Sequence, residues 1–375
     1  MMKAEGRSRA ITIFHRVLEI PVERRMDFLA EACAGDSALR IEVQELLDNA
    51  EKTTTSLLDT EPCGRIFPQR PRSSPPIFAP GDVVGQRYEV IRFIAKGGMG
   101  EVYEVEDGEL KTRVALKTIA HSLVLSAHQL TRFKREIQLA RKVTHRNVCR
   151  VYDIGHHSHP AYGDILFLTM ELLQGITLAG QLQQQGAMTC DQALPLIGQM
   201  VSALSAAHQL GIIHRDFKPA NVMLVEETGQ NLVKVTDFGL ARSVQPVENF
   251  THSFAEVVGT PSYMAPEQFR GQYGRETDVY ALGLTIFEML TARLPTSPDA
   301  PFKDVQNGKE QRIGARWKSV IKKCIAPDPA ERFYDVGNVW QSLSRGSSAR
   351  YLDSNPLVST VKGYAIVFKG VVLLA

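Results

Sequence analysis

The chain has 375 residues, which is long enough to bury a large core and to form more than one folded unit. A hydrophobic content of 44% and a charged content of 22% are ordinary for a soluble globular protein, and a formal net charge of only +2 gives no global field that would attract nucleic acid. The N-terminus lacks a signal-peptide pattern. No CxxC pair occurs, which argues against a disulfide framework or a zinc site and, with the N-terminus, predicts a cytoplasmic protein. The five cysteines are Cys33, Cys63, Cys149, Cys190 and Cys324.

Residues 1–52 are predicted to form a small helical module. Apolar side chains recur on one face at helical spacing, beginning with Ile13, Phe14, Val17 and Leu18. Gly35-Asp36-Ser37 supplies a break and a new N-cap. The module carries no cluster of catalytic side chains, so its role stays open between docking or regulation and a plain structural cap.

Residues 53–87 are predicted to be a linker. A run of threonine and serine at 53–56 is followed by repeated prolines, and this composition favours extended chain over a packed core. The prolines are Pro62, Pro68, Pro71, Pro75, Pro76 and Pro80.

Three strands with a glycine-rich turn are expected next. Tyr88–Phe93 alternates in polarity, a second strand runs to about Glu106, and a third carries Val114-Ala115-Leu116-Lys117. The turn Gly97-Gly98-Met99-Gly100 joins two strands, and this context differs from the strand-to-helix turn of a dinucleotide-binding fold. Alone it is either a flexible hairpin or a loop whose backbone N–H groups approach phosphate oxygens.

Lys117 and Glu136 are predicted to form an ion pair. Lys117 lies on an apolar strand, and Glu136 lies beside the apolar face of a helix expected over residues 126–143. A charge held near a core is costly unless it is paired, so mutual pairing is the economical solution. The alternative is two surface charges that extend to solvent.

A polar loop, His214–Asn221, lies between the apolar pair Ile212-Ile213 and the apolar run at 222–225. A strand at 165–170 and a helix at 193–210 precede it, and a hairpin of 222–225 and 232–235 follows. This hairpin returns Asp237 to the neighbourhood of Asn221 and Asp216. Asn221 and Asp237 offer hard oxygen ligands that suit Mg²⁺, and Asp216 is then free to accept a proton.

In this order and spacing, the motifs closely resemble the eukaryotic-type protein kinase family, in particular its bacterial serine/threonine members. They are the glycine-rich turn, the strand ending at Lys117, Glu136, the loop 214–221, Asp237-Phe238-Gly239 and Ala265-Pro266-Glu267. The resemblance implies an α+β, bilobal protein-kinase fold over residues 88–343. A small β-rich N-lobe (88–170) is joined by a hinge (171–175) to a larger helical C-lobe (176–343).

The resemblance also implies the roles of individual residues. Asp216 is the expected catalytic base, Lys218 neutralises charge on the transferred phosphoryl group, and Asn221 and Asp237 hold Mg²⁺. The implied ATP-binding residues are Ile94, Ala95, Gly97, Gly98, Gly100, Val102, Ala115, Lys117, Met170, Glu171 and Leu173. Structural or regulatory roles are implied for Glu136, Arg215, Phe238, Gly239, Thr251, Ser253, Thr260, Glu267, Asp278 and Arg332.

Regulation is expected at Thr251 or Ser253, where autophosphorylation would order the activation loop through contacts to Arg215. One departure from the family pattern is Ala95, which replaces the first glycine of the turn and is expected to tighten the strand end and lower nucleotide affinity. The expected partners are protein substrates and a second copy of the chain for trans-autophosphorylation. The competing interpretations are a pseudokinase scaffold and a non-kinase adaptor organised by the N-terminal helices.

The C-terminal segment 344–375 ends in a mostly apolar stretch from Val361, which is short for a membrane span of about 20 residues. Lys362 and Lys369 interrupt it. A docked tail is the first interpretation, and a partial membrane anchor, with a membrane-associated protein, is the alternative.

Overall fold

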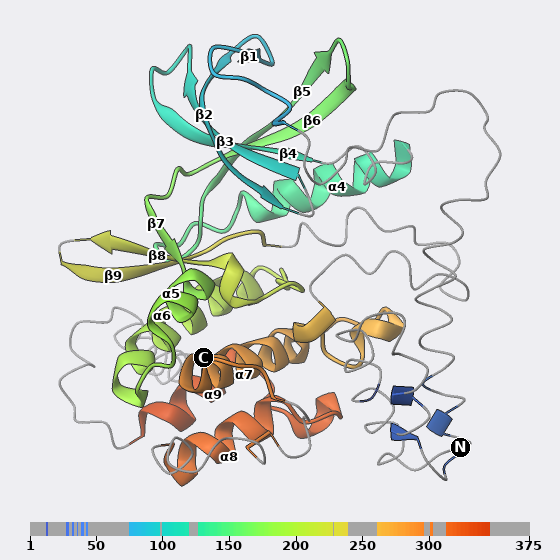
Figure 1. Cartoon of the computed structure of the whole chain (residues 1–375), viewed down its shortest axis with the longest axis vertical. Coiled ribbons are helices and arrows are strands. Elements are labelled where there is room, and N and C mark those ends of the chain that lie inside the picture. Colours follow the sequence, from blue (N-terminus) through green and yellow to red (C-terminus); the bar gives the residue numbers. More distant parts are fainter. Residues whose placement is uncertain are drawn as a thin grey trace, which may run out of the picture.

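The computed structural model of the chain describes residues 75–97, 100–119, 127–227, 229–238, 261–295, 301–302 and 313–345, with positions 13, 28, 29, 32, 33, 36, 39, 40 and 43. Figure 1 shows an upper lobe built mainly of strands and a lower lobe built mainly of helices. The α+β, two-lobed architecture expected from the sequence is confirmed.

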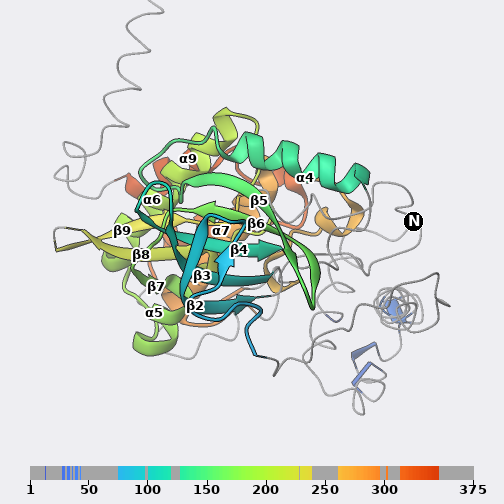
Figure 2. The ribbon, with the colours of Figure 1, turned by 90° about the horizontal axis from the view of Figure 1, so that it is seen from above.

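The described strands of the N-lobe form one antiparallel sheet with the order β1-β2-β3-β4-β6-β5. Its strands are β1 (Val83–Val84), β2 (Tyr88–Gly97), β3 (Gly100–Asp107), β4 (Arg113–Ile119), β5 (Val151–His159) and β6 (Gly163–Met170). One face carries the buried cluster of Tyr88, Tyr103, Leu116 and Phe167. The helix α4 (Ala127–Ala140) lies along the sheet, where its Ile137 packs with Ile119 and Leu168 (Figure 2). The strand β5 was not predicted, because its histidine-rich sequence lacks apolar alternation.

The end of the predicted linker belongs to this lobe. Phe78 is only 2% exposed and packs in the same cluster as Tyr103, and β1 lies within the range assigned to the linker. The N-lobe sheet therefore begins before Tyr88, with β1 and the segment around Phe78. The prolines around Phe78 indicate extended chain, and extended chain can still pack against a sheet when it carries an apolar anchor.

The C-lobe is mainly helical, with a small antiparallel sheet of order β7-β8-β9 beside the lobe junction. Its described helices are α5 (Leu178–Gln185), α6 (Cys190–Gln209), α7 (Arg275–Thr291), α8 (Ala315–Cys324) and α9 (Val336–Ser344). Its strands are β7 (Gly175–Thr177), β8 (Val222–Glu227) and β9 (Gln230–Val235). Short 3₁₀ turns are η2 (Pro219–Asn221), η4 (Pro261–Tyr263), η5 (Gln268–Arg270) and η7 (Pro329–Glu331).

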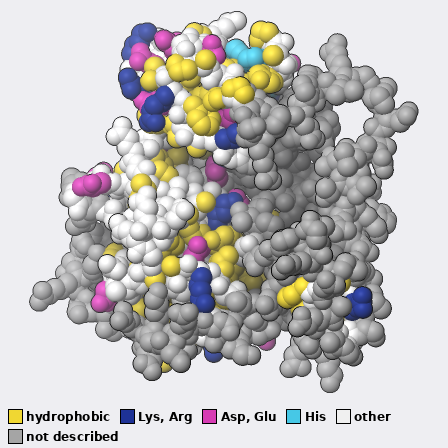
Figure 3. All heavy atoms as spheres, viewed as in Figure 1, with side chains coloured by type: hydrophobic (Ala, Val, Ile, Leu, Met, Phe, Trp, Pro, Cys, Tyr) yellow, Lys and Arg dark blue, Asp and Glu magenta, His cyan; other side chains and the backbone are white. Residues whose placement is uncertain are grey.

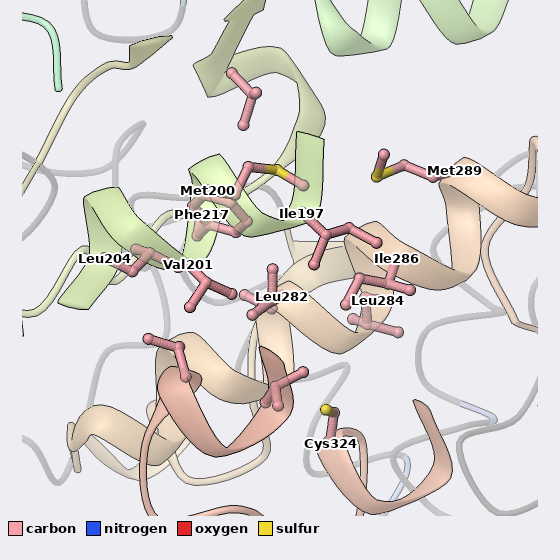
Figure 4. Close-up of a cluster of buried hydrophobic side chains, with 14 of the residues drawn as sticks. Ile197, Met200, Val201, Leu204, Phe217, Leu282, Leu284, Ile286, Met289 and Cys324 are labelled. Atoms are coloured by element: carbon pink, nitrogen blue, oxygen red, sulfur yellow. The ribbon is translucent and has the colours of Figure 1, made fainter. Parts of the chain in front are cut away.

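The helix α6 is specified locally at both ends. Thr189 and Gln192 form a reciprocal capping box at its start, and Gly211, with φ of +72°, follows its end. Its apolar face meets α7 in the main core, where Ile197 lies near Ile286 (Figure 4). This core fixes the direction in which α6 delivers the chain to the polar loop at 214–221.

Part of the N-terminal module packs against the C-lobe. The buried side chains Ile13, Leu29, Cys33, Leu39 and Val43 form a cluster, and Phe269 of η5 packs against it. The module is therefore in contact with the segment that follows Glu267 in the chain.

Within the described ranges, no helix has the length and apolar character needed to cross a membrane. The C-terminal segment 346–375 lies outside them, so the prediction for the apolar tail stays a prediction.

Candidate active site

Asp278 of α7 holds the polar loop at 214–221 in place. This carboxylate is fully buried and accepts hydrogen bonds from the backbone N–H groups of His214 (2.8 Å) and Arg215 (2.9 Å) and from Nε2 of His208 (2.7 Å). Burial by itself raises the pKa of Asp278, but the hydrogen bond and charge of His208 outweigh it, so the pKa lies below its ordinary value. Asp278 is thus ionised and fixes the backbone of the loop.

The backbone of Arg215 has an unusual conformation that these contacts maintain. Its φ is +68°, in the left-handed region that residues other than glycine rarely adopt. In addition to the bond from its N–H to Asp278, its carbonyl accepts a hydrogen bond of 2.9 Å from Nε2 of Gln268. The turn carries the chain directly into Asp216.

Asp216, Lys218 and Asn221 converge on one point. Nζ of Lys218 lies 2.8 Å and 3.0 Å from the two carboxylate oxygens of Asp216. Nδ2 of Asn221 donates to Asp216 at its backbone carbonyl (2.7 Å) and at Oδ2 (3.1 Å). The Asp216 residue is 8% exposed, and these contacts hold its carboxylate in a fixed orientation.

His214 supports the loop rather than contributing a free imidazole. Its ring is buried, lies 4.6 Å from the ring of Phe238, and donates from Nε2 to the carbonyl of Thr236 at 2.9 Å. His214 thus packs the start of the loop against Phe238.

The ion pairs between the lobes differ from those expected. Nζ of Lys117 lies 2.7 Å from Oδ1 of Asp237, while Oε1 of Glu136 lies 3.4 Å from Nη1 of Arg215. The Lys117–Glu136 pair expected from the sequence is therefore replaced by two other pairs. The Arg215 side chain is only 17% exposed and needs a nearby carboxylate, and Glu136 supplies it.

Asp237 is ionised in this arrangement. Burial raises the pKa of its carboxyl group, but the charge of Lys117 and its hydrogen bond outweigh burial and leave the pKa below the ordinary value. The φ of Asp237 is +63°, and aspartate tolerates this left-handed conformation better than most residues.

The donor set fits a magnesium site at Asn221 and Asp237. The Nδ2 atom of Asn221 is occupied by Asp216, and the described contacts show no hydrogen bond to its Oδ1. Lys117 occupies only Oδ1 of Asp237 among the described contacts. Amide and carboxylate oxygens are the hard ligands that Mg²⁺ prefers, so the residues present match the ion.

The residues expected around adenine share one face of the N-lobe sheet. Val102 is directly opposite Lys117 in the β3–β4 ladder, and Ala115 is opposite Met170 in the β4–β6 ladder. Because opposed residues and residues two apart project to the same side, all four side chains face the junction between the lobes. Figure 3 shows acidic and basic side chains meeting at this junction.

The connector between the lobes leaves backbone groups available. No hydrogen bond involves the backbone N–H or carbonyl of Leu173 in the described structure. The N–H of Glu171 donates to the carbonyl of Arg150 at 2.8 Å, which orients the connector. Such uncommitted backbone groups can pair with the polar edge of a purine.

The two sides of the glycine-rich turn differ. Gly100 has a φ of +145°, and a Cβ atom there would lie 1.8 Å from the carbonyl oxygen of Thr118, so only glycine fits. Ala95 lies in β2, pairs with Val102 of β3 and has no positive φ, so its methyl group imposes no backbone strain. Ile94 is 39% exposed beside it, at a register irregularity of the strand.

Glu267 and Arg332 form a buried bidentate ion pair, with N–O distances of 2.7 Å and 2.8 Å. The remaining Arg332 donors bond to backbone carbonyls of Ala326, Glu276 and Pro327. The pair therefore holds the start of η5 and α7 against the segment before η7.

Several expected site residues lie outside the described ranges: Gly98, Gly239, Thr251, Ser253 and Thr260. Their roles remain predictions.

Sequence reasoning missed two supporting residues. Gln268 accepts from the N–H of Ala265 (2.9 Å) and donates to the carbonyl of Arg215, which links η5 to the polar loop at 214–221. Lys234 binds the carboxylate of Glu171 at 2.6 Å, and its position between buried Val233 and Val235 could have indicated an inter-element contact. No local pattern indicated Gln268, beyond its place directly after Ala265-Pro266-Glu267.

Comparison with known proteins agrees with this geometry. The protein kinase domain family matches residues 88–339. The chain is 34% identical over 273 residues to the serine/threonine-protein kinase PknB of Mycobacterium tuberculosis, covering 70% of this chain and 43% of that protein. It is 35% identical over 266 residues to the serine/threonine-protein kinase PrkC of Bacillus subtilis, covering 68% of this chain and 39% of that protein. The chain thus spans less than half the length of these relatives.

Among solved structures, the kinase domain of Mycobacterium tuberculosis PknI is similar, with a TM-score of 0.55 and 25% identity, covering 72% of this chain and 100% of that one. The family match extends over most of the chain and includes the whole constellation around Asp216. The resemblance expected from the sequence is confirmed, and the chain belongs to the protein kinase family.

Proposed function

We propose that the chain is a serine/threonine protein kinase, which transfers the γ-phosphoryl group of ATP to hydroxyl groups of protein substrates. The observation that carries the proposal is the convergence of Lys218 and Asn221 on the Asp216 carboxylate, close to an ionised Asp237. A binding scaffold without catalysis would need neither a fixed proton acceptor nor these partners. The membership of the chain in the protein kinase family supports the same conclusion.

In the proposed reaction, Asp216 accepts the proton of a serine or threonine hydroxyl as its oxygen attacks the γ-phosphorus. The bond from that phosphorus to the bridging oxygen breaks, and ADP leaves with the electron pair. Nζ of Lys218, 2.8 Å from Oδ2 of Asp216, is placed to offset charge on the phosphoryl group during transfer. In the family that the chain resembles, a lysine at the position of Lys218 is typical of members that act on serine and threonine.

Nucleotide binding would use both lobes. Lys117 would contact the α- and β-phosphates, and the Leu173 backbone would pair with the adenine edge between Val102 and Ala115. Asn221 and Asp237 would hold Mg²⁺. A bound Mg²⁺ ion offsets the negative charge of the phosphates, which lets the phosphoryl group approach the carboxylates of the site.

The observed ion pairs support a regulatory step. We propose that the arrangement with Lys117 bound to Asp237 and Glu136 bound to Arg215 is a resting state. Autophosphorylation at Thr251 or Ser253 would give Arg215 a stronger anion, because a phosphate carries nearly two charges and three acceptor oxygens. Glu136 would then be released to bind Lys117, and Asp237 would be released to bind Mg²⁺.

A radiolabelled ATP assay of the full chain with Mg²⁺ tests the proposed activity. The wild type should label itself or a generic basic protein, and Asp216→Asn should reduce labelling by ~10³-fold or more while nucleotide binding is retained. Equal labelling by the two proteins would refute the role of Asp216. Phosphopeptide mapping of the labelled wild type tests the regulatory step, because an unmodified loop in an active enzyme contradicts it.

We further propose a cytoplasmic enzyme that associates with a second copy for trans-autophosphorylation. Free, buried Cys149 and Cys324 suit a reducing compartment. Labelling of a catalytically inactive chain by the wild type would test transfer between copies. Fractionation of the full chain beside a version ending near Arg345 would test whether the apolar tail attaches it to a membrane.

A further inference from the structure

The segment just before β1 packs on the outer face of the N-lobe sheet. Phe78 inserts between aromatic rings, with ring centroids 5.5 Å from Tyr103, 5.2 Å from His157 and 5.8 Å from His159. Tyr103 projects from β3 to the side opposite Val102, because side chains alternate along a strand. Phe78 therefore lies on the face of β3 that is turned away from the proposed nucleotide site.

Two hydrogen bonds tie the backbone of this segment to β3. The N–H of Ile77 donates to Oε2 of Glu101 at 2.8 Å, and the N–H of Phe78 donates to the hydroxyl oxygen of Tyr103 at 3.2 Å. Just before β1, the N–H of Gly81 donates to the carbonyl of Val90 in β2 at 2.8 Å. Residues 77–81 thus form a strap across the outside of the sheet.

Glu101 is the point where the strap meets the glycine-rich turn. The Glu101 residue is 3% exposed. Its carboxylate accepts hydrogen bonds from the hydroxyl group of Tyr103 and from the N–H of Ile77, and lies 3.4 Å from Nζ of Lys96 on the other side of the turn. Burial, and next the bond to Glu101, raise the pKa of Tyr103, so its hydroxyl stays protonated and donates.

The backbone at Glu101 is equally constrained. Its N–H donates to Oγ1 of Thr118 at 2.8 Å, and the preceding Gly100 lies directly against the carbonyl of Thr118. The next residue, Val102, faces the opposite side of the sheet with Lys117. A change in the orientation of Glu101 therefore moves both Gly100 and Val102, which flank the proposed phosphate and adenine positions.

We propose that the strap 77–81 positions the start of β3 for ATP, with Phe78 as its anchor and the Glu101 carboxylate as the connection. This inference rests on the proposed nucleotide site. Phe78 and Glu101 touch no reacting atom and act as positioning residues, through Gly100 and Val102. Through residues 77–81, the end of the predicted linker is physically connected to the proposed nucleotide site.

The test compares variants of the full chain in their dissociation constant for Mg-ATP, measured by calorimetry. Phe78→Ala and Glu101→Leu should weaken binding by about tenfold, which corresponds to a modest coupling energy between the strap and the nucleotide site. Glu101→Gln keeps an acceptor for Ile77 and should stay within about twofold of the wild type on the same scale. Val84→Ala removes a buried side chain from the same cluster without touching Glu101, and should also leave binding unchanged.

Hydrogen exchange of peptides covering 100–107 gives a second readout that does not require catalysis. Exchange should accelerate in Phe78→Ala and Glu101→Leu, and not in the two controls. Wild-type affinity in Glu101→Leu, or equal weakening by Val84→Ala, overturns the inference. A wild type that binds nucleotide but transfers no phosphate refutes the proposed function, while the binding and exchange measurements still decide the inference.

Discussion

Replacing Arg332 by methionine should strongly destabilise the C-lobe, because the Glu267–Arg332 ion pair is buried. The Arg332 side chain has no exposed surface, and the Glu267 side chain is 7% exposed. Arg332→Met leaves the Glu267 carboxylate with Thr277 as its one remaining side-chain donor in the described structure, at 3.1 Å. It also removes the donor from the backbone carbonyls of Ala326, Glu276 and Pro327.

Removal of one partner from a buried pair costs ~3–5 kcal/mol, since the other charge stays desolvated. For a domain of this size each kcal/mol shifts the Tm by ~2–4 °C, so Arg332→Met should lower it by ~6–20 °C. Differential scanning fluorimetry of the full chain, with urea unfolding for the free energy, measures both quantities.

Arg146→Met is the matched control for Arg332→Met. It makes the same substitution in the Arg146–Glu227 pair, whose side chains are 64% and 56% exposed at a separation of 3.3 Å. Exposed pairs contribute ~0–1 kcal/mol, so this variant should melt within ~4 °C of the wild type. If the two variants lose the same stability, burial is not what makes the Glu267–Arg332 pair important, and the reasoning fails.

Three further outcomes follow from other contacts. Gly100→Ala should weaken nucleotide binding and lower the Tm, because its Cβ would meet the backbone of Thr118 at 1.8 Å; unchanged binding and melting would contradict the close contact. Phe269→Ser should release the N-terminal cluster, seen as faster limited proteolysis within residues 1–52 while the kinase lobe keeps its Tm; an unchanged cleavage rate would exclude docking through Phe269. The hydrogen bond from Arg87 lowers the pKa of Asp107 to about 2, so this group stabilises the fold above about pH 4 and loses that contribution as the pH falls toward 2. Asp107→Asn should therefore lose less stability than the wild type between about pH 4 and pH 2 in urea unfolding, and equal losses would refute the assignment.

The sequence by itself predicted most strands of the N-lobe, the helix α6 and the candidate residues of the site. Alternating polarity predicted β2 and β3, apolar runs predicted β4 and β6, and an apolar face at helical spacing predicted α6 from residue 193 onward. The residue types in the loop 214–221 and at Asp237 already indicated a base, a cation and magnesium ligands. These features depend on local periodicity and on short motifs, which a single stretch of chain contains in full.

Only the tertiary structure decided which charged groups pair and which segments pack together. Glu136 and Asp237 are both suitable partners for Lys117, and no pattern near any of them distinguishes the two. The choice depends on where α4 and β9 come to rest relative to β4, since Coulomb attraction acts over a few ångströms in space and is indifferent to distance along the chain. The packing of Phe78 is likewise a tertiary property. Its surrounding prolines indicate a linker, whereas in the fold its ring packs against the rings of Tyr103 and His157.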